Sequence, residues 1–315
     1  MPHVSVIVPA RDAARTLART LRGLESQASA PDFEVIVVDD ASRDETPTLA
    51  AGSPVVAEVL AGGGKGPAAA RNAGAARARS DAIAFLDADC EPTPGWLAAG
   101  TAALTDADLV QGMVRPRPEA PIGPFDRTLS VTSPWGLFES ANLFLRRETF
   151  ERVGGFESWL RPQRGIELGE DVWLGWRARR AGARTAFCED ALAWHEVFPR
   201  GPGAYIVERA RVRFFPAMAA RIPELRDDFF WRRLFLSRRS ALFDLALAGV
   251  AAAGARRSPL PLLAALPYAR DACRHALRAG DIRRAPAVAA ADVAADAVTA
   301  AALAAGSLRS RSPVL

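Results

Sequence analysis

Cysteine is scarce in this sequence of 315 residues, and the three cysteines that occur are far apart. Cys90, Cys188 and Cys273 have neither the spacing of a metal-binding motif nor the even number of a disulfide framework. The pattern excludes a small disulfide-stabilised fold and favours a reducing compartment. The N-terminus also lacks a basic segment followed by an apolar stretch, so we expect no signal peptide and a cytoplasmic protein.

Long apolar runs are missing as well. Residues 241–254 are mostly apolar, but they span only 14 positions and contain Asp244. Residues 285–306 are rich in alanine and contain Asp292 and Asp296, four positions apart. Because a membrane-spanning helix needs about 20 strongly apolar residues, we expect neither segment to cross a bilayer. Both should form helices that pack on the rest of the protein or lie on a membrane surface.

Charge is unevenly distributed along the chain. Residues 1–199 hold 21 basic and 27 acidic residues, a net charge of −6, whereas residues 200–315 hold 19 basic and 9 acidic residues, a net charge of +10. A basic C-terminal third predicts an anionic partner, such as the inner face of a membrane or a phosphorylated lipid. The alternative is that arginine and alanine simply reflect a GC-rich genome. We expect no nucleic-acid partner.

The first third of the sequence alternates strand and helix patterns. Apolar, β-branched runs predict strands at residues 4–8, 33–38, 55–60, 83–86 and 108–114. Segments with helical spacing or composition separate them, at residues 13–28, 46–51, 68–79 and from 96 onward. Such alternation predicts an α/β fold with a mostly parallel sheet covered by helices on both faces.

The remaining sequence suggests three regions. We assign residues 1–114 to a ligand-binding half of an α/β domain and residues 115–202 to the other half of the same domain. The second half begins with a proline-rich, irregular connection. Residues 203–315 have a helical pattern and form an extension rich in alanine and arginine.

Acidic residues follow the predicted strands at the points where the strands end. They are Asp12, Asp39, Asp40, Asp87 and Asp89. In open α/β sheets, ligands bind beyond the carboxyl ends of the strands. Two carboxylates spaced as Asp87 and Asp89 can converge on Mg²⁺ or Mn²⁺ and leave positions open for phosphate oxygens. The alternative is a solvated loop, because this short pattern is common by chance.

Three further polar groups are candidates for chemistry. Arg71, after a glycine-rich loop, suits the oxygens of a diphosphate. Glu170 and Asp171, before an amphipathic helix, can serve as a general base, or can simply be acids favoured at a helix N-terminus. His195 is either a metal ligand or a partly buried structural histidine. The glycine loop matches neither the P-loop nor the dinucleotide pattern.

Seven segments occur together in an order that resembles family 2 glycosyltransferases of the GT-A fold. They are VSVIVPARD at 4–12, VVDDASRDET at 37–46, ARNAG at 70–74, FLDAD at 85–89, NLFLRR at 142–147, GGF at 154–156 and GEDVWL at 169–174. The resemblance covers roughly residues 3–200. It implies a GT-A sheet, followed here by a helical C-terminal extension.

The resemblance also implies roles for individual residues. A nucleotide-sugar site would be lined by Pro9, Arg11, Asp39, Asp40, Arg71 and Asp87. A divalent metal, Mg²⁺ or Mn²⁺, would be held by Asp87, Asp89 and His195. The catalytic base would be Asp171, with Glu170 beside it. We place the acceptor pocket in residues 115–165, with Trp135, Asn142 and Trp159 as candidate contacts; the alternative for the tryptophans is a place in the core.

The reaction implied is the transfer of one sugar, with inversion, from a nucleoside diphosphate to a hydroxyl. We expect a UDP-linked donor and a lipid-linked or cell-envelope glycan as acceptor. The chain departs from the family pattern in two places: Asp12 stands where asparagine is commoner, and Ser140 and Ala141 precede Asn142 where a glycine-containing turn is usual. Neither a Gln-x-x-Arg-Trp signature nor several spanning helices occur, which argues against a processive synthase.

Two rival functions fit the sequence less well. A sugar nucleotidyltransferase would use a related sheet, but it would carry a glycine-rich basic loop after the first strand, where this chain has only residues 9–12. A non-catalytic glycan- or nucleotide-binding relative would be expected to have lost one of Asp87, Asp89 or Asp171, and all three are present.

Overall fold

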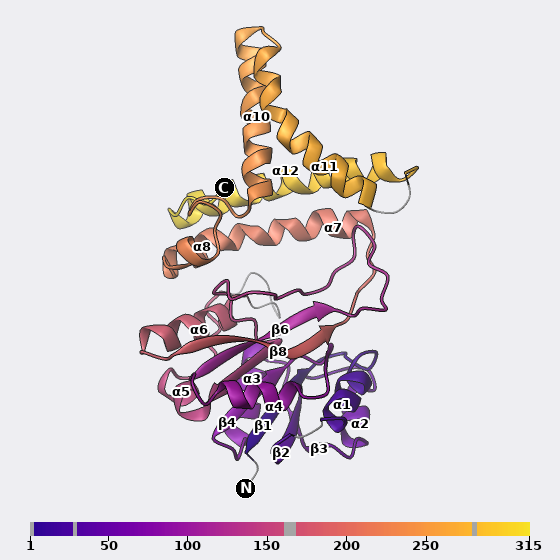
Figure 1. Ribbon diagram of the computed structural model, residues 1–315, viewed down its shortest axis with the longest axis vertical. Coiled ribbons are helices and arrows are strands. Elements are labelled where there is room, and N and C mark those ends of the chain that lie inside the picture. The colour runs from indigo at the N-terminus through magenta and orange to yellow at the C-terminus, as the bar shows by residue number, and fades with distance from the viewer. Residues whose placement is uncertain (1–2, 28–29, 161–167, 279–281) are drawn as a thin grey trace. The chain divides into compact units, whose positions relative to one another are not determined.

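The computed structural model describes residues 3–27, 30–160, 168–278 and 282–315 (Figure 1). The chain forms two compact units. The first comprises Met1–Ala120 and Thr128–Val197, and the second comprises Pro121–Arg127 and Phe198–Leu315. The two halves of the α/β domain, predicted at 1–114 and 115–202, therefore fall mainly in the first unit. The chain passes into the second unit at 198 and also contributes to it a short segment from the irregular connection.

One eight-stranded sheet organises the first unit. Its strands are β1 Val4–Ala10, β2 Phe33–Asp39, β3 Val56–Ala61, β4 Ala82–Leu86, β5 Cys90–Pro92, β6 Leu109–Pro116, β7 Asn142–Arg146 and β8 Thr185–His195. Their order across the sheet is β3-β2-β1-β4-β7-β6-β8-β5. All five strands predicted from apolar runs are present.

The sheet is mixed rather than uniformly parallel. Strands β1 to β4 pair only in parallel with one another, as predicted. Strand β7 then lies antiparallel to both β4 and β6, and β5 lies antiparallel to β8. Since β6 and β8 are again parallel, β7 reverses the direction only locally. The parallel half places the ends of β1, β2 and β4 along one edge.

Six helices accompany this sheet in the part of the first unit that the structure describes. They are α1 Leu17–Glu25, α2 Thr46–Ala51, α3 Pro67–Arg77, α4 Trp96–Ala103, α5 Arg147–Arg152 and α6 Glu170–Arg180. Helix α1 buries Leu17, Leu21 and Leu24, the apolar positions that recur at helical spacing in the sequence. These leucines join the main core, which the buried strand residues build from one face of the sheet.

Helix α3 lies unusually close to the sheet because its residues are small. A Cβ at Gly74 would come within 2.5 Å of Ile7 Cγ2 on β1. Pro67 occupies the first turn, where its fixed backbone angle suits a helix start. The close approach of α3 brings Arg71, one turn before Gly74, into the edge of the sheet where the acids lie.

The second unit is helical. Its elements are α7 Pro202–Glu208, the 3₁₀ helix η1 Arg209–Phe214, α8 Phe215–Arg221, α9 Leu225–Asp228, α10 Arg238–Arg256, the 3₁₀ helix η2 Leu260–Ala265, α11 Leu266–Arg278 and α12 Ala285–Ser310. Helix α10 packs against η2 and α11 as a hairpin, and α12 runs past its base (Figure 1). The predicted helical extension is thus present.

Helix α12 corrects one expectation. It continues for 26 residues, and by length and composition it is the one helix among the described residues that could cross a membrane. The prediction that this segment falls short was wrong on length and composition, because a long alanine-rich helix tolerates its few charged residues and still has a mean hydropathy of 1.6 over an 18-residue window. One face of α12 nevertheless packs inside the second unit, against α7, η1, α8 and α11.

The packed face of α12 carries a buried polar network. Asp292 has no exposed surface and accepts hydrogen bonds from Tyr205 Oη at 3.1 Å and from His275 Nδ1 at 2.6 Å. Asp296, one turn later, accepts from Arg239 Nε and Tyr268 Oη, both at 2.8 Å. Because buried carboxylates are costly without partners, these bonds fix α12 as a structural helix of this unit.

Candidate active site

Acidic side chains gather at the edge of the sheet where β1, β2 and β4 end. Asp12 follows β1, Asp39 and Asp40 close β2, and Asp87 and Asp89 follow β4. The parallel registers of β1 with β2 and with β4 bring the three strand ends to the same edge. The placement predicted from the sequence is therefore the one that the structure has.

Asp40 organises the glycine-rich loop. Its two carboxylate oxygens accept from the backbone N–H groups of Lys65 and Gly66, each at 2.9 Å. Arg11 Nη1 lies 3.8 Å from the same carboxylate. Gly62 approaches so closely that a Cβ there would lie 3.0 Å from Asp40 Oδ1. The buried Asp40 thus links the loops after β1 and β3, with Arg11 exposed above it.

The other predicted nucleotide residues lie on the same loops. Asp39 Oδ1 accepts from Ser42 N at 3.3 Å, and Asp12 Oδ1 accepts from Arg43 N at 2.8 Å. Pro9 is half-buried inside β1, opposite Val38. Asp12 adopts a left-handed backbone, with φ of 49°, which aspartate tolerates better than most residues. Asp12 and Asp39 therefore shape the loops through backbone bonds.

Arg71 is the central cation of the site. Its buried guanidinium donates to Asp87 Oδ1 at 2.7 Å and to Glu170 Oε1 at 3.4 Å. The ring of Phe156 lies 5.5 Å from the guanidinium carbon. Burial disfavours the charged form, but the carboxylates of Asp87 and Glu170 outweigh it and raise the pKa of Arg71. Arg71 thereby connects the acid after β4 with the acids that begin α6.

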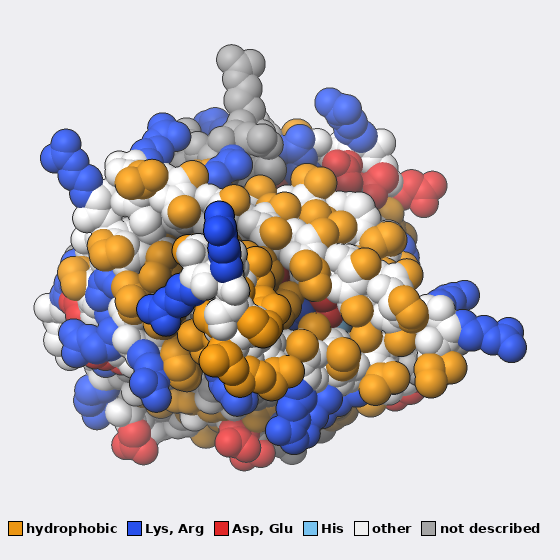
Figure 2. All heavy atoms as spheres, turned by 90° about the horizontal axis from the view of Figure 1, so that it is seen from above, with side chains coloured by type: hydrophobic (Ala, Val, Ile, Leu, Met, Phe, Trp, Pro, Cys, Tyr) orange, Lys and Arg blue, Asp and Glu red, His pale blue; other side chains and the backbone are white. Residues whose placement is uncertain are grey.

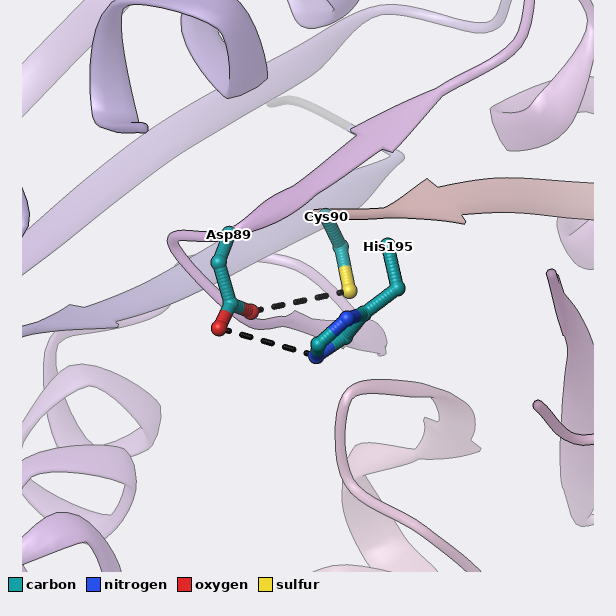
Figure 3. A group of neighbouring side chains, drawn as sticks. All are labelled: Asp89, Cys90 and His195. Atoms are coloured by element: carbon teal, nitrogen blue, oxygen red, sulfur yellow. Dashed lines mark hydrogen bonds and ion pairs between the residues drawn. The ribbon is translucent and has the colours of Figure 1, made fainter. Parts of the chain in front are cut away.

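Asp89, in the turn between β4 and β5, and His195, at the end of β8, point toward each other (Figure 3). Cys90 on β5 pairs with His195 on β8 in an antiparallel register, and Asp89 lies in the turn directly before β5. His195 Nε2 lies 3.6 Å from Asp89 Oδ2. One ligand atom each from Asp89, Cys90 and His195 lie within 4.8 Å of one another.

The histidine ring is held from its other side. Glu196 O lies 2.6 Å from Nδ1, and a carbonyl can only accept. Thr128 Oγ1 and Leu129 N also approach Nδ1, but at the longer distance of 3.2 Å. We therefore assign the proton to Nδ1, which turns the lone pair of Nε2 toward Asp89. A backbone carbonyl on the second ring nitrogen is the usual support of a metal-binding histidine.

The donor set fits a hard divalent cation in part. A carboxylate and an imidazole nitrogen suit Mn²⁺ or Mg²⁺. Burial, with Asp89 and Asp87 nearby, raises the pKa of the Cys90 thiol well above its ordinary value. Cys90 therefore lines the site as a neutral thiol and is not a thiolate ligand. Asp87 pairs with Arg71 through Oδ1, and its role as a third metal ligand stays a prediction.

Asp171 lies in the first turn of α6 and has an unusual acidity. Its Oδ2 accepts from Ser140 N at 3.3 Å and its Oδ1 from Val172 N at 2.8 Å. Burial raises its pKa to about 6, with Arg71 opposing the shift and Glu139 adding to it. A carboxyl group with this pKa is ionised at neutral pH, and it is more basic than an ordinary aspartate. These are the properties of a general base.

Glu139 is a member of the site that the sequence did not reveal. Its Oε1 accepts from Trp135 Nε1 at 3.0 Å, and its buried Oε2 has no hydrogen-bond partner among the described residues. Burial raises the pKa of Glu139. It belongs to none of the seven motifs and lies in an irregular segment. Its one sequence signal is a position three residues before Asn142, next to the family motif.

The predicted acceptor residues have different surroundings. Trp135 stands beside Glu139, and Trp159 Nε1 donates to Gly169 O at 3.0 Å, just before α6. Asn142, in contrast, is fully buried: its amide donates to Met113 O and Ala191 O and accepts from Trp96 Nε1. The expected acceptor contact of Asn142 was wrong, because its whole amide joins strands β6, β7 and β8.

Comparisons with known proteins place this arrangement in a family. Residues 5–158 match the family described as Glycosyl transferase family 2. Glycosyltransferase AglE of Haloferax volcanii is 30% identical over 216 residues, which are 64% of this chain and 69% of AglE. The chain belongs to glycosyltransferase family 2. The Pre-mycofactocin glycosyltransferase of Mycobacterium tuberculosis is 33% identical over 223 residues, which are 61% of this chain and 42% of that longer protein.

A solved mannosyltransferase structure extends the likeness to the C-terminal helices. The mannosyltransferase PcManGT from Pyrobaculum calidifontis, in complex with GDP-Man and Mn²⁺, is 25% identical. The match has a TM-score of 0.61 and covers 95% of this chain and 87% of that one. The GT-A fold with a C-terminal helical extension is thereby confirmed. In this glycosyltransferase, Arg71 joins Asp87 to Glu170.

Proposed function

We propose that this glycosyltransferase transfers a single sugar, with inversion, from a nucleoside diphosphate to an acceptor hydroxyl. The observation that carries the proposal is the bridge made by Arg71, which bonds to Asp87 on one side and to Glu170 on the other. Asp171, beside Glu170, has the raised pKa of a base. The bridge therefore brings Asp87, which follows β4, close to Glu170 and to the neighbouring Asp171, the proposed proton acceptor.

The donor would bind along the edge of the sheet. The loops tied together by Asp40, with Arg11 and Pro9 nearby, suit a nucleoside. Asp89 and His195 would hold a divalent cation, which would supply positive charge for the departing diphosphate. Arg71 is buried and fixed by its carboxylates, so it can add a preorganised positive charge near the same oxygens.

The chemical step is one displacement. Asp171 takes the proton of the acceptor hydroxyl, and the oxygen attacks the anomeric carbon while the bond to the diphosphate oxygen breaks. The attacking and leaving oxygens lie on opposite faces of the sugar, so configuration inverts. No covalent bond forms between sugar and protein. At pH 7, one unit above the pKa of about 6, about nine-tenths of Asp171 is ionised and ready to accept the proton.

The identity of the donor nucleotide and the class of acceptor are also proposed. We keep the expectation of a UDP-linked sugar, although GDP-Man is the ligand of PcManGT. The acceptor we propose is a lipid-linked or cell-envelope glycan, and the support for it is the net charge of +10 over residues 200–315. Trp135 and Trp159 offer aromatic surfaces suited to a sugar ring.

Donor binding and hydrolysis by the purified protein test the proposal. UDP-, GDP- and dTDP-sugars are each supplied with Mn²⁺, Mg²⁺ or EDTA. We expect one donor to bind and hydrolyse slowly in a metal-dependent manner, and Asp89→Ala to lose both properties. Asp106→Ala, which removes an exposed acid of the same unit, is the matched control and should behave as the wild type. A folded protein that binds none of these donors would contradict the proposal.

A further inference from the structure

The hairpin of α10, η2 and α11 has an outer half that packs only on itself. Phe243, Ala246 and Gly249 form the inward stripe of α10. Phe243 meets Tyr268 with ring centroids 5.1 Å apart, and a Cβ at Gly249 would lie 2.6 Å from Pro261 O. The two limbs are thus closely packed against each other. Beyond the level of Phe243, α10 continues for 13 residues, or about 20 Å.

Apolar side chains are exposed on both limbs of this outer half. Leu245, Leu247 and Val250 on α10 are 48%, 50% and 56% exposed. The second limb exposes Leu260, Leu262, Leu263 and Leu266, by 72%, 45%, 61% and 61% respectively. The space-filling view shows hydrophobic side chains spread over this end of the molecule, with arginines among them and around the margin (Figure 2). Isolated surface leucines are ordinary, but so many on one projection mark an interaction site.

Charged residues are sparse in the outer half of the hairpin, whereas α11 carries Arg270, Asp271 and Arg274 after Tyr268. Arg238 and Arg239 begin α10, and Arg256 and Arg257 stand at the turn. Between these pairs the one acidic or basic residue is Asp244, and residues 258–269 contain none. Burial raises the pKa of Asp244. An apolar middle with arginines at both ends is the pattern of a segment that meets lipid tails and lipid phosphates together.

Helix α12 extends the same apolar surface at the base of the hairpin. Its buried side holds Asp292, whereas Asp296 is half-buried in the polar network. The exposed positions of α12 before Leu308 are alanines, Pro286 and Val293, with no charged residue among them. The exposed side of α12 before Leu308 is therefore apolar, which suits a helix lying at a membrane surface.

We propose that the α10–η2–α11 hairpin inserts into a lipid bilayer that contains anionic lipids. A protein partner would cover one side of a helix, whereas the exposed leucines here lie on both limbs of a projecting pair. Lipid tails can contact such a pair when it lies at the boundary between headgroups and acyl chains, and Arg238, Arg256 and Arg257 then meet anionic headgroups. None of these residues belongs to the catalytic site, so the proposal stands apart from the donor chemistry.

Flotation of the full-length protein with lipid vesicles tests this insertion. Vesicles are made of phosphatidylcholine alone or with about one-third phosphatidylglycerol, at 0.1 M and 1 M NaCl. We expect binding to the anionic vesicles that persists in part at 1 M NaCl, because buried leucines are not screened by salt. The double variant Leu262→Glu/Leu263→Glu should lower the partition coefficient at least tenfold.

Two further variants make the test specific. Ile122→Glu/Val207→Glu places the same charges on exposed apolar residues of the same unit outside the hairpin, and should bind as the wild type. Arg256→Gln/Arg257→Gln should weaken binding to anionic vesicles about tenfold while leaving binding to phosphatidylcholine unchanged. Equal binding by the hairpin variant and the wild type would overturn the proposal. So would a protein that ignores vesicles and forms dimers that Leu262→Glu/Leu263→Glu dissociates.

Discussion

At the scale of single residues, the site depends on carboxyl groups whose neighbours set their acidity. Asp171 and Glu139 are both shifted upward by burial, while Arg71 opposes the shift of Asp171. Arg71 itself keeps its charge because Asp87 and Glu170 flank it. Charge at this site is therefore a shared property of four acids and one arginine, and replacing one member should change the others.

Replacing Asp171 by asparagine should separate activity from stability. We expect Asp171→Asn to lower transfer by about 10²–10⁴-fold, the usual contribution of a general base. Its pKa of about 6 lies above the ordinary value of 3.8, so the fold favours the protonated carboxyl. The stability that this group contributes is complete below pH 3.8 and is lost as pH rises through 6.

The Asp171→Asn variant should consequently melt at a higher temperature than the wild type at pH 8, by a few degrees, and show a smaller difference at pH 4. Thermal unfolding followed by circular dichroism at both pH values measures this. An equal difference at the two pH values would mean that Asp171 has an ordinary pKa in the folded protein.

Glu139→Gln should move the pH profile of transfer. The carboxylate of Glu139 helps to raise the pKa of Asp171, so its neutral isostere should lower that pKa. Because the base works when it is deprotonated, the acidic limb of kcat/KM should move to lower pH. Glu148→Gln, at an exposed acid on α5, is the control. A profile that does not move would leave Glu139 with a packing role only.

At the scale of elements, the sequence predicts well where periodicity is strong. The apolar runs at β1, β2 and β4 are typical of buried strands, and the leucine spacing of α1 is typical of an amphipathic helix. The antiparallel β7 was not predicted, because its direction depends on the path of residues 117–141, which have no periodic pattern. Glu139 and the structural role of Asn142 depend on the same path.

The close contact of α3 with β1 gives a prediction for this pair of elements. In Gly74→Ala the new methyl group would lie 2.5 Å from Ile7 Cγ2, so α3 must shift. We expect a loss of about 1–3 kcal/mol in the free energy of unfolding, together with weaker donor binding because α3 carries Arg71. Urea unfolding and donor titration measure the two effects.

Gly52→Ala is the control for this experiment. A Cβ at Gly52 would meet its nearest neighbour at an ordinary 3.4 Å, so its stability should change by less than about 0.5 kcal/mol. An equally small change in the free energy of unfolding for Gly74→Ala would mean that the space between α3 and β1 has room for a methyl group.

At the scale of the whole molecule, family and fold could be predicted from motif order, because seven loose motifs in sequence constrain one another. The exposed hairpin could not, since residues 241–254 have the composition of an ordinary core helix. Only the three-dimensional packing distinguishes the covered leucines from the exposed ones.

Metal and donor should together stabilise the catalytic unit. A ligand present at 100 times its Kd adds about 2.7 kcal/mol to folding. We expect the cognate nucleotide sugar with Mn²⁺ to raise the melting midpoint of the first unit by several degrees, and EDTA to cancel the rise. Differential scanning calorimetry follows this, with Asp89→Ala as the comparison. A donor shift that survives both EDTA and Asp89→Ala would remove the metal from the site.

The segment Pro121–Arg127 has a consequence for how such proteins can be divided and recombined. Arg127 and Phe198 exchange two backbone hydrogen bonds of 2.9 Å within the second unit. The chain therefore contributes Pro121–Arg127 to the second unit before Thr128–Val197 completes the first unit. A protein cut after Val197 would keep one half of this pairing and lose the other. Exchange of C-terminal units between relatives, in the laboratory or in evolution, would require two separate pieces of gene to move together.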